Sequence, residues 1–364
     1  MSRFPRAWLA LPCLAVCACS APTSSVEPAE GMAACASCHA DYVDELSRSA
    51  HGGSGDSPVL TALLPEVERA WGVGARLRCE HCHTRAEAAD GVVSCALCHR
   101  AVGNRGGDGS IVIDPSLPIA ATRPDAASPH PLRQTGLLRD AQLCGSCHEL
   151  TGPELFVEPT LSEHLASPMA RGGVTCADCH LPEREANGSG EANHRHDFVG
   201  FDPPWGAPAD EGSRAAADSL ALLRAGLDLR VRRDGDELVL ELENVGASHH
   251  IPTGATWLRE IWVDVRLVRA SGVQEARVLS LGAEPMHEGQ PVVLITDADE
   301  VVEHSLGSGE VRSHRFDARD LESASFTLKA RAARPEILRA LGLESRLPEV
   351  PTHEAANLSY EAAR

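Results

Sequence analysis

The sequence predicts two domains, a mainly irregular and α-helical N-terminal domain followed by a small β-sandwich domain. Three observations predict this division. Five copies of Cys-x-x-Cys-His lie between residues 35 and 180, and none follows them. Apolar periodicity is weak in the same region, and aromatic residues make up only 4% of the chain. After about residue 225 the pattern alternates between apolar and polar residues, as in half-buried strands.

The five motifs predict covalently attached c-type haem, because two thiols bond to the porphyrin and the following histidine reaches the iron. Zinc needs four ligands per metal and does not explain a histidine after every second cysteine. We therefore expect five haem c groups, whose apolar surface forms most of the core of this mainly irregular/α domain. The attachment cysteines are Cys35, Cys38, Cys79, Cys82, Cys95, Cys98, Cys144, Cys147, Cys176 and Cys179, and the proximal iron ligands are His39, His83, His99, His148 and His180.

The first residues predict export. Two arginines precede an apolar stretch over 8–19, which is too short to span a bilayer and is typical of a secretory signal. Val16-Cys17-Ala18-Cys19 resembles a bacterial lipobox, so Cys19 is the predicted lipidation site. A lipobox that ends at Cys17 is a weaker alternative, because Val16 is bulky for the cleavage position, and ordinary signal-peptidase cleavage near Ala21 without a lipid is the other. We expect a lipoprotein signal peptide over 1–19, a tether over 20–31, and a periplasmic or outer-membrane/surface location.

The net charge of −19 bears on the partners of the chain. It argues against nucleic acid, whose phosphates would be repelled, and it favours basic or neutral partners. A role in solubility alone explains the charge equally well. We expect redox partner proteins, in particular other cytochromes, and membrane contact through the N-terminal lipid.

The predicted elements follow in order along the chain. The haem domain is expected over 32–205, with short helices around the motifs joined by loops rich in glycine and proline. A linker over 202–212 leads to a helix over 213–223, at the start of a β domain over 213–364. Segments 227–233 and 237–244 predict a hairpin with its turn at Asp234-Gly235. Further strands are expected over 260–272, 292–298 and 325–333, and a helix over 335–343. About seven strands at this spacing indicate a β-sandwich.

Each haem iron needs a sixth ligand or an open position, so the histidines outside the motifs are candidates. A second imidazole saturates the iron and suits electron transfer, whereas an open position permits ligand chemistry. At each position an ordinary surface or backbone-bonded histidine is the alternative. The favoured ligands are His51 at a predicted helix end, His130 between two prolines, His164 in a predicted helix, His196 before Asp-Phe, and His249 before Pro-Thr-Gly. The remaining histidines, including His81, His287, His304, His314 and His353, are not expected to bind iron.

These patterns resemble the secreted multihaem c-type cytochromes related to the tetrahaem electron acceptor of hydroxylamine oxidation. The resemblance covers most of 33–270. It implies that His249, rather than His250, opens the β domain. Many such proteins have four haems, so one is additional here. His164 stands where relatives often carry tryptophan, which implies that it serves the additional haem. The resemblance rests on CASCH followed by Ser49-Ala50-His51, the run from Leu161 through GGVTCADCHLP (172–182), HDFVG (196–200) and HHIPTG (249–254).

The pattern favours an electron carrier rather than an enzyme, and no catalytic residue is predicted. We expect a multihaem c-type cytochrome that transfers electrons at the bacterial cell envelope through mostly bis-histidine haems. Only eleven residues separate His83 from Cys95, which brings the second and third haems close together. The alternative is a multihaem oxidoreductase acting on a small nitrogen or sulfur compound at one open haem. A structural surface protein is a third class.

Overall fold

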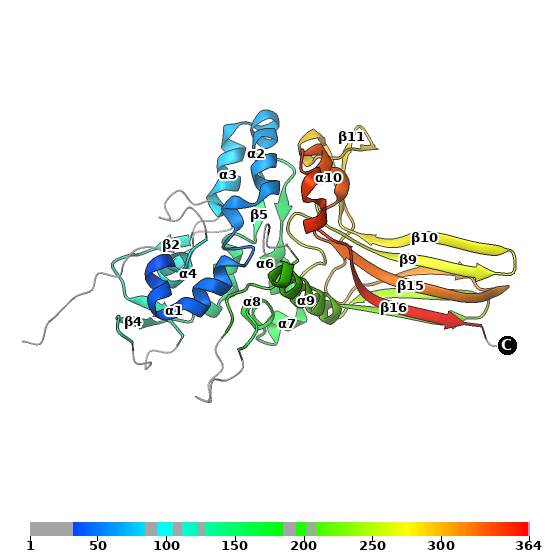
Figure 1. Cartoon of the computed structure of the whole chain (residues 1–364), viewed down its shortest axis with the longest axis horizontal. Helices are drawn as coiled ribbons and strands as arrows, with labels where there is room; N and C mark the ends of the chain where they lie inside the picture. Colours follow the sequence, from blue (N-terminus) through cyan, green and yellow to red (C-terminus); the bar gives the residue numbers. More distant parts are fainter. Residues whose placement is uncertain are drawn as a thin grey trace, which may run out of the picture.

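The computed structural model describes residues 32–83, 93–104, 111–122, 128–184, 194–201, 205 and 209–362. A helical lobe and a β-rich lobe lie side by side along the long axis (Figure 1). The predicted signal peptide, the tether and Cys19 lie outside the described residues, as does most of the predicted linker. Within these residues, none of the helices combines the length and apolar character that a bilayer crossing requires.

The helical lobe consists of short helices and small sheets. Each Cys-x-x-Cys-His motif lies within a helix or overlaps the end of one. The helices are α1 (Met32–Ser47), α2 (Pro58–Trp71), α3 (Val73–His83), α4 (Cys95–His99), α5 (Ala141–Gly145), α6 (Thr160–Ala166), α7 (Pro168–Arg171) and α8 (Cys176–His180), with 3₁₀ turns η1 (Ser54–Asp56) and η2 (Leu137–Arg139). The strand pairs are β1 (Ala101–Asn104) with β2 (Ile111–Ile113), β3 (Ile119–Ala121) with β4 (Leu132–Gln134), and β5 (Leu150–Thr151) with β6 (Val157–Glu158).

Local capping explains where several of these helices begin. Ser57 accepts a hydrogen bond from the Leu60 amide at the start of α2, and Pro58 occupies the first helical position. In α8, Asp178 accepts a hydrogen bond from the Thr175 amide at 2.7 Å, which completes a capping box around CADCH. The motif sequence therefore also stabilises the short helix that presents it.

The β lobe begins with α9 (Ala209–Gly226) and a hairpin of β7 (Leu227–Asp234) and β8 (Glu237–Asn244). The hairpin is predicted correctly, but its turn lies one residue later than expected. Asp234 pairs with Glu237, so Gly235 occupies the first turn position with φ 60°. Glycine is favoured there because the backbone is left-handed.

Two antiparallel sheets enclose the main core of this lobe. One has the order β10 (Gly272–Leu281), β9 (Glu260–Arg269), β15 (Leu321–Arg331) and β16 (His353–Glu361), and the other has the order β14 (Val311–Asp317), β8 and β7. Alternate residues point inward, as a strand requires. Leu238 and Leu240 of β8 share one buried apolar cluster with Val263 and Val265 of β9 and with Phe326 of β15.

A third sheet, with the order β12 (Gln290–Pro291), β11 (Ala283–His287) and β13 (Glu300–Glu303), covers the end of the lobe. The strand predicted over 292–298 is wrong, because this segment contains the 3₁₀ turn η3 (Ile295–Asp297). Ile295 is instead buried beside Trp257 and Ile337, the latter in α10 (Pro335–Ala340). Its apolar run therefore reflects packing against helices rather than strand pairing. The turn η4 (Glu344–Glu349) follows α10.

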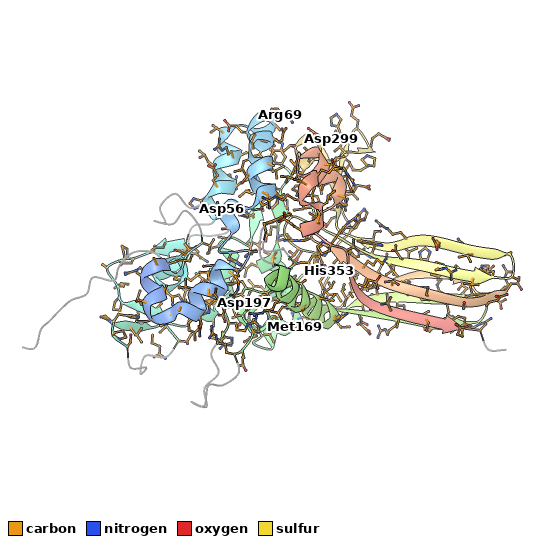
Figure 2. The ribbon with its side chains drawn as sticks, in the orientation of Figure 1. Asp56, Arg69, Met169, Asp197, Asp299 and His353 are labelled. Atoms are coloured by element: carbon orange, nitrogen blue, oxygen red, sulfur yellow. The ribbon has the colours of Figure 1, made fainter. Side chains whose placement is uncertain are left out.

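Apolar contacts join the two lobes. Val59 of α2 is buried in a cluster with Leu338 of α10, and Trp205 packs against the same cluster. Arg69 of α2 lies 3.5 Å from Asp297 of the β lobe, and Figure 2 labels Arg69 and Asp299 at this junction. The helical lobe is therefore held directly against the β lobe, which places the β-lobe loops next to the motif helices.

Candidate functional site

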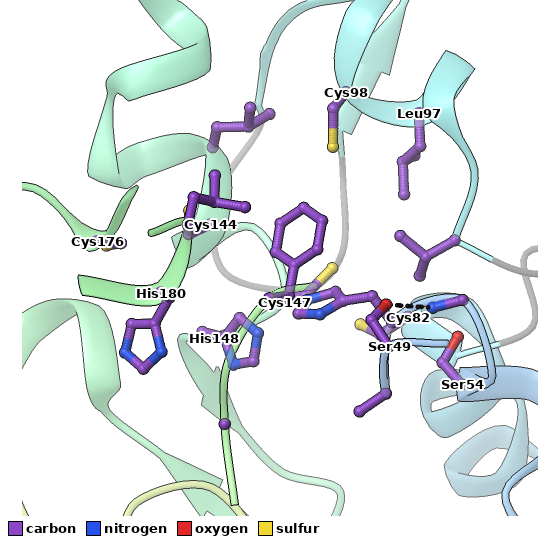
Figure 3. Close-up of a pocket in the computed structure, with 18 of the residues that line it drawn as sticks. Ser49, Ser54, Cys82, Leu97, Cys98, Cys144, Cys147, His148, Cys176 and His180 are labelled. Carbon is purple, nitrogen blue, oxygen red and sulfur yellow. Dashed lines mark hydrogen bonds between the residues drawn. The ribbon is translucent and has the colours of Figure 1, made fainter. Parts of the chain in front are cut away.

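One large cavity, of about 3120 Å³, extends through the helical lobe to the near end of the β lobe. Its lining includes all ten motif cysteines, all five motif histidines, and the five further histidines that the sequence favours as ligands. Figure 3 shows part of this space, with Cys98, Cys144, Cys176, His148 and His180 around it. Pockets for one small molecule usually occupy about 300–1,000 Å³. The cavity therefore suits several large groups rather than a single small substrate.

Four motif histidines each face a second histidine across the cavity. An imidazole nitrogen lies about 2.0–2.1 Å from a transition metal that it binds, so two imidazoles on opposite sides of one metal have ring centres about 6 Å apart. The observed pairs have this spacing. Their centroid distances are 6.3 Å for His39 and His130, 6.0 Å for His148 and His51, 6.2 Å for His99 and His196, and 6.2 Å for His180 and His249.

Hydrogen bonds from Nδ1 hold most of these rings in place. Such bonds set the tautomer of a ligating histidine and leave Nε2 for the metal. His148 is bonded to the Glu158 carboxylate at 2.6 Å. The other acceptors are main-chain carbonyls: Ala120 for His99 (2.8 Å), Val199 for His180 (2.6 Å), His250 for His249 (2.8 Å), His194 for His196 (3.3 Å) and Pro131 for His130 (3.4 Å).

A tight turn after α1 places His51. Ser49 donates a hydrogen bond to the Leu46 carbonyl at 2.7 Å and accepts one from the Gly52 amide at 3.1 Å, the bond drawn in Figure 3. A Cβ atom at Gly52 would lie 2.1 Å from the Leu46 carbonyl oxygen, so only glycine fits there. The Ser-Ala-His-Gly segment is thus folded back on the helix, with His51 opposite His148.

Two aromatic side chains connect histidines of different pairs. The Tyr42 ring lies 6.0 Å from the ring of His39 and 4.9 Å from the ring of His196. The Phe198 ring lies 4.4 Å from the ring of His51 and 6.2 Å from that of His196. Both aromatic residues therefore fill the space between neighbouring pairs.

One face of α6 docks the β-lobe loop that carries His249. Thr160, Glu163 and His164 have the i, i+3, i+4 spacing that shares one helix face. Thr160 Oγ1 lies 2.5 Å from Thr253 Oγ1, and Glu163 accepts a hydrogen bond from the His250 amide at 2.9 Å. These contacts hold the loop at His250, directly after His249, and at Thr253.

The two neighbouring histidines in this loop have different environments. His249 faces His180, whereas His250 Nδ1 lies 2.9 Å from the Glu163 carboxylate. Burial, together with the nearby ring of His180, lowers the pKa of His249 to about 4, and burial also lowers the pKa of His196 to about 4. Both rings are neutral at physiological pH, which is the form that binds a metal.

His164 lies on the docking face of α6 and is 5% exposed. Its Nδ1 is hydrogen-bonded to Ser248 Oγ at 2.8 Å, and burial lowers its pKa. Within the described part of the chain, His164 forms no ring pair with a motif histidine. Its role as an iron ligand therefore stays a prediction.

The remaining histidines occupy varied positions. The main-chain carbonyl of His83, at the end of α3, accepts a hydrogen bond from Ser54 at 2.8 Å, so the second motif lies beside the turn that carries His51. His81 is exposed on α3, and His287, His304 and His314 are exposed on the β lobe. The closeness expected between the second and third motifs depends on 84–92, which lies outside the described residues.

Sequence reasoning missed three residues that shape the site: Tyr42, Glu158 and Asn244. Glu158 had a usable signal, since it is the one charge in the run Leu155-Phe156-Val157-Glu158-Pro159. Glu158 is only 8% exposed, and it contacts His148, which lies ten residues earlier in the sequence. Asn244 ends β8 with a 1% exposed side chain. Nothing in the sequence around Tyr42 indicates that it touches two separate histidines.

Comparison with known proteins identifies a shared fold. A penta-heme cytochrome c552 from Thermochromatium tepidum has a similar solved structure, with a TM-score of 0.64 and 15% sequence identity. The match covers 92% of this chain and 99% of that chain, so it includes both lobes. No protein-family model matches the sequence, and no curated protein matches it.

Proposed function

We propose that this chain is a multihaem c-type cytochrome that transfers electrons at the bacterial cell envelope. The observation that carries the proposal is the set of four histidine pairs, spaced 6.0–6.3 Å apart, in one cavity lined by ten motif cysteines. The fold shared with a penta-heme cytochrome supports it at low sequence identity. Haem supplies one-electron redox chemistry at its iron when bound.

The residues present fit five haem c groups. Each motif provides two thiols and a histidine on or next to a helix that borders the cavity. We assign His130, His51, His196 and His249 as the partners of His39, His148, His99 and His180. His164 stays in the proposed ligand set, because its bond to Ser248 leaves Nε2 available.

The contacts support an order of sites that differs from the order of motifs along the chain. Tyr42 connects the His39 pair to the His99 pair, and Phe198 connects the His99 pair to the His148 pair. The Cys144 and Cys176 side chains interact with each other, which connects the fourth motif to the fifth. We therefore propose a path through motifs 1, 3, 4 and 5, with motif 2 beside the His51 turn.

Coordination by two neutral imidazoles favours electron transfer over substrate chemistry. A saturated iron has no position for a substrate, and ligands held by Nδ1 hydrogen bonds need little rearrangement when the iron changes oxidation state. The proposed partners are redox proteins, in particular other cytochromes. Lipidation at Cys19, which lies outside the described residues, is part of the proposal and would anchor the protein at the envelope.

The test uses the full chain, produced with its haem-attachment machinery. We expect five haem c groups per chain and predominantly low-spin spectra in both oxidation states. Carbon monoxide added to the reduced protein is expected not to bind stoichiometrically. A sizeable high-spin fraction that binds carbon monoxide would instead favour an oxidoreductase acting at an open haem.

A further inference from the structure

The hydrogen-bond acceptor distinguishes His148 from five other histidines of the four pairs. Five of the paired histidines donate from Nδ1 to a main-chain carbonyl. His148 is bonded instead to Glu158 Oε1, at 2.6 Å. A carboxylate that accepts a hydrogen bond at this distance forms a stronger bond than a neutral carbonyl. The proximal ligand of the fourth motif therefore has a different electronic environment from those five.

Glu158 is enclosed beside His148, with its Oε1 atom on the imidazole Nδ1. The Arg259 guanidinium and the Glu158 carboxylate both lie next to Gly254. The Glu158 side chain is 11% exposed, so solvent screens its charge only weakly. Gly254 leaves room for this arrangement, because a Cβ atom there would lie 2.7 Å from the Arg259 guanidinium and 3.7 Å from Glu158.

A carboxylate acceptor makes the imidazole a stronger ligand for a metal. It draws the Nδ1 proton toward the carboxylate, which makes Nε2 a stronger donor. A stronger donor, together with a buried negative charge, stabilises iron(III) more than iron(II). Reduction of an iron bound here would take one electron from a redox partner protein, and the Nδ1 proton would stay on His148.

We propose that Glu158 acts through His148 as a redox-tuning residue that lowers the midpoint potential of the iron bound at the fourth motif. The inference rests on the proposed function, since it requires haem at Cys144, Cys147 and His148. Phe198 contacts His51 of the His148 pair, and Cys144 of the fourth motif interacts with Cys176 of the fifth motif. Glu158 therefore sets the energetic step in the middle of the proposed path.

The matched experiment compares E158Q with E163Q in the full haem-containing protein. Glu163 is also a nearly enclosed carboxylate, 13% exposed, that is bonded to a histidine, but that histidine is His250, outside the four pairs. The measurement is a potentiometric titration followed by electron paramagnetic resonance. For E158Q we expect one midpoint potential to rise by about 59 mV, a tenfold change in the one-electron reduction equilibrium. E163Q is expected to leave that potential unchanged.

The outcomes separate this proposal from the proposed function. An unchanged potential in E158Q, or an equal rise in E163Q, overturns the tuning role while the low-spin spectra stand. A wild-type protein whose haems are largely high-spin and bind carbon monoxide overturns the proposed function itself. If E158Q fails to attach its haems, E158D takes its place, because the shorter carboxylate weakens the same bond. A smaller rise in the same potential then supports the proposal, and an unchanged value overturns it.

Discussion

The rings of His180 and His249 face each other with their centroids 6.2 Å apart and their planes 21° from parallel. His180 ends the motif helix α8, whereas His249 belongs to a loop of the β lobe. One metal between the two rings would therefore join the two lobes. The β lobe then serves the site directly, as the source of a ligand, rather than as a separate module.

Replacing His249 should affect both the site and the lobe contact. In H249A we expect one haem to change from low to high spin, because His180 loses the ring opposite it. We also expect faster proteolysis between the lobes, since a metal-mediated link adds to the α6 contacts. H250A is the matched control, because His250 contacts Glu163 and no motif histidine in the described structure. Equal spectra for H249A and the wild type would remove the assignment.

The orientation of the ring pairs predicts two classes of ferric signal. The planes are 16° and 21° apart in the His99–His196 and His180–His249 pairs, but 56° and 62° apart in the His39–His130 and His148–His51 pairs. Two parallel imidazoles interact with the same iron d orbital and separate its energy from that of a second d orbital. Two crossed imidazoles each interact with a different d orbital, so the two energies stay close. We expect two rhombic signals and two signals with a large maximum g value in electron paramagnetic resonance. Four signals of a single class would be incompatible with these pairings.

Asn244 positions the loop that carries His249. Its side-chain amide donates to the carbonyls of His249 and Leu306, each at 3.0 Å, and its side-chain oxygen accepts from the Ala247 amide at 3.0 Å. In N244A these buried partners lose their hydrogen bonds, so we expect the free energy of unfolding to fall by about 1–3 kcal/mol. Denaturant titration measures the change. N357A, at an exposed position of β16, should change it by no more than about 0.5 kcal/mol.

The turn that supports Asn244 predicts a pH dependence. Burial alone would raise the pKa of Glu310, but hydrogen bonds from Arg312 and from the Gly307 amide, both at 2.8 Å, lower it overall. A carboxyl whose folded pKa lies below its unfolded value stabilises the fold above the unfolded pKa, and this contribution disappears as the pH falls through the folded pKa. We therefore expect E310Q to be less stable than the wild type at pH 7 and equally stable at low pH.

Denaturant titrations at several pH values test this expectation, with E322Q as the control for the loss of one negative charge at an exposed position. Glu310 affects the site because its main-chain carbonyl accepts a hydrogen bond from the main-chain N–H of Asn244 at 3.1 Å. A difference between E310Q and the wild type that persists unchanged to low pH would contradict the role given to the ionised carboxylate.

Local sequence patterns predict the structural features that depend on residues close together in the sequence. The alternation over 227–244 predicted the hairpin, and the Cys-x-x-Cys-His spacing predicted which side chains share the cavity. The apolar run over 292–298 was misleading, because an apolar segment buried against helices has the same composition as a strand. Its partners, such as Ile337, are distant in sequence.

The pairing of histidines could not be predicted from the sequence for the same reason. His148 faces His51, almost a hundred positions earlier, and His99 faces His196. Such contacts depend on how the short helices pack around the cavity, which periodicity does not encode. The choice of His249 over His250 came from the resemblance, and the structure places His249 opposite His180.

A crystal structure of the haem-containing protein, with iron located by anomalous scattering, tests the central claim most directly. We expect one iron between the rings of each of the four pairs, His39 with His130, His148 with His51, His99 with His196, and His180 with His249. An iron bound to any of these motif histidines but carrying a different sixth ligand, or none, would contradict the account.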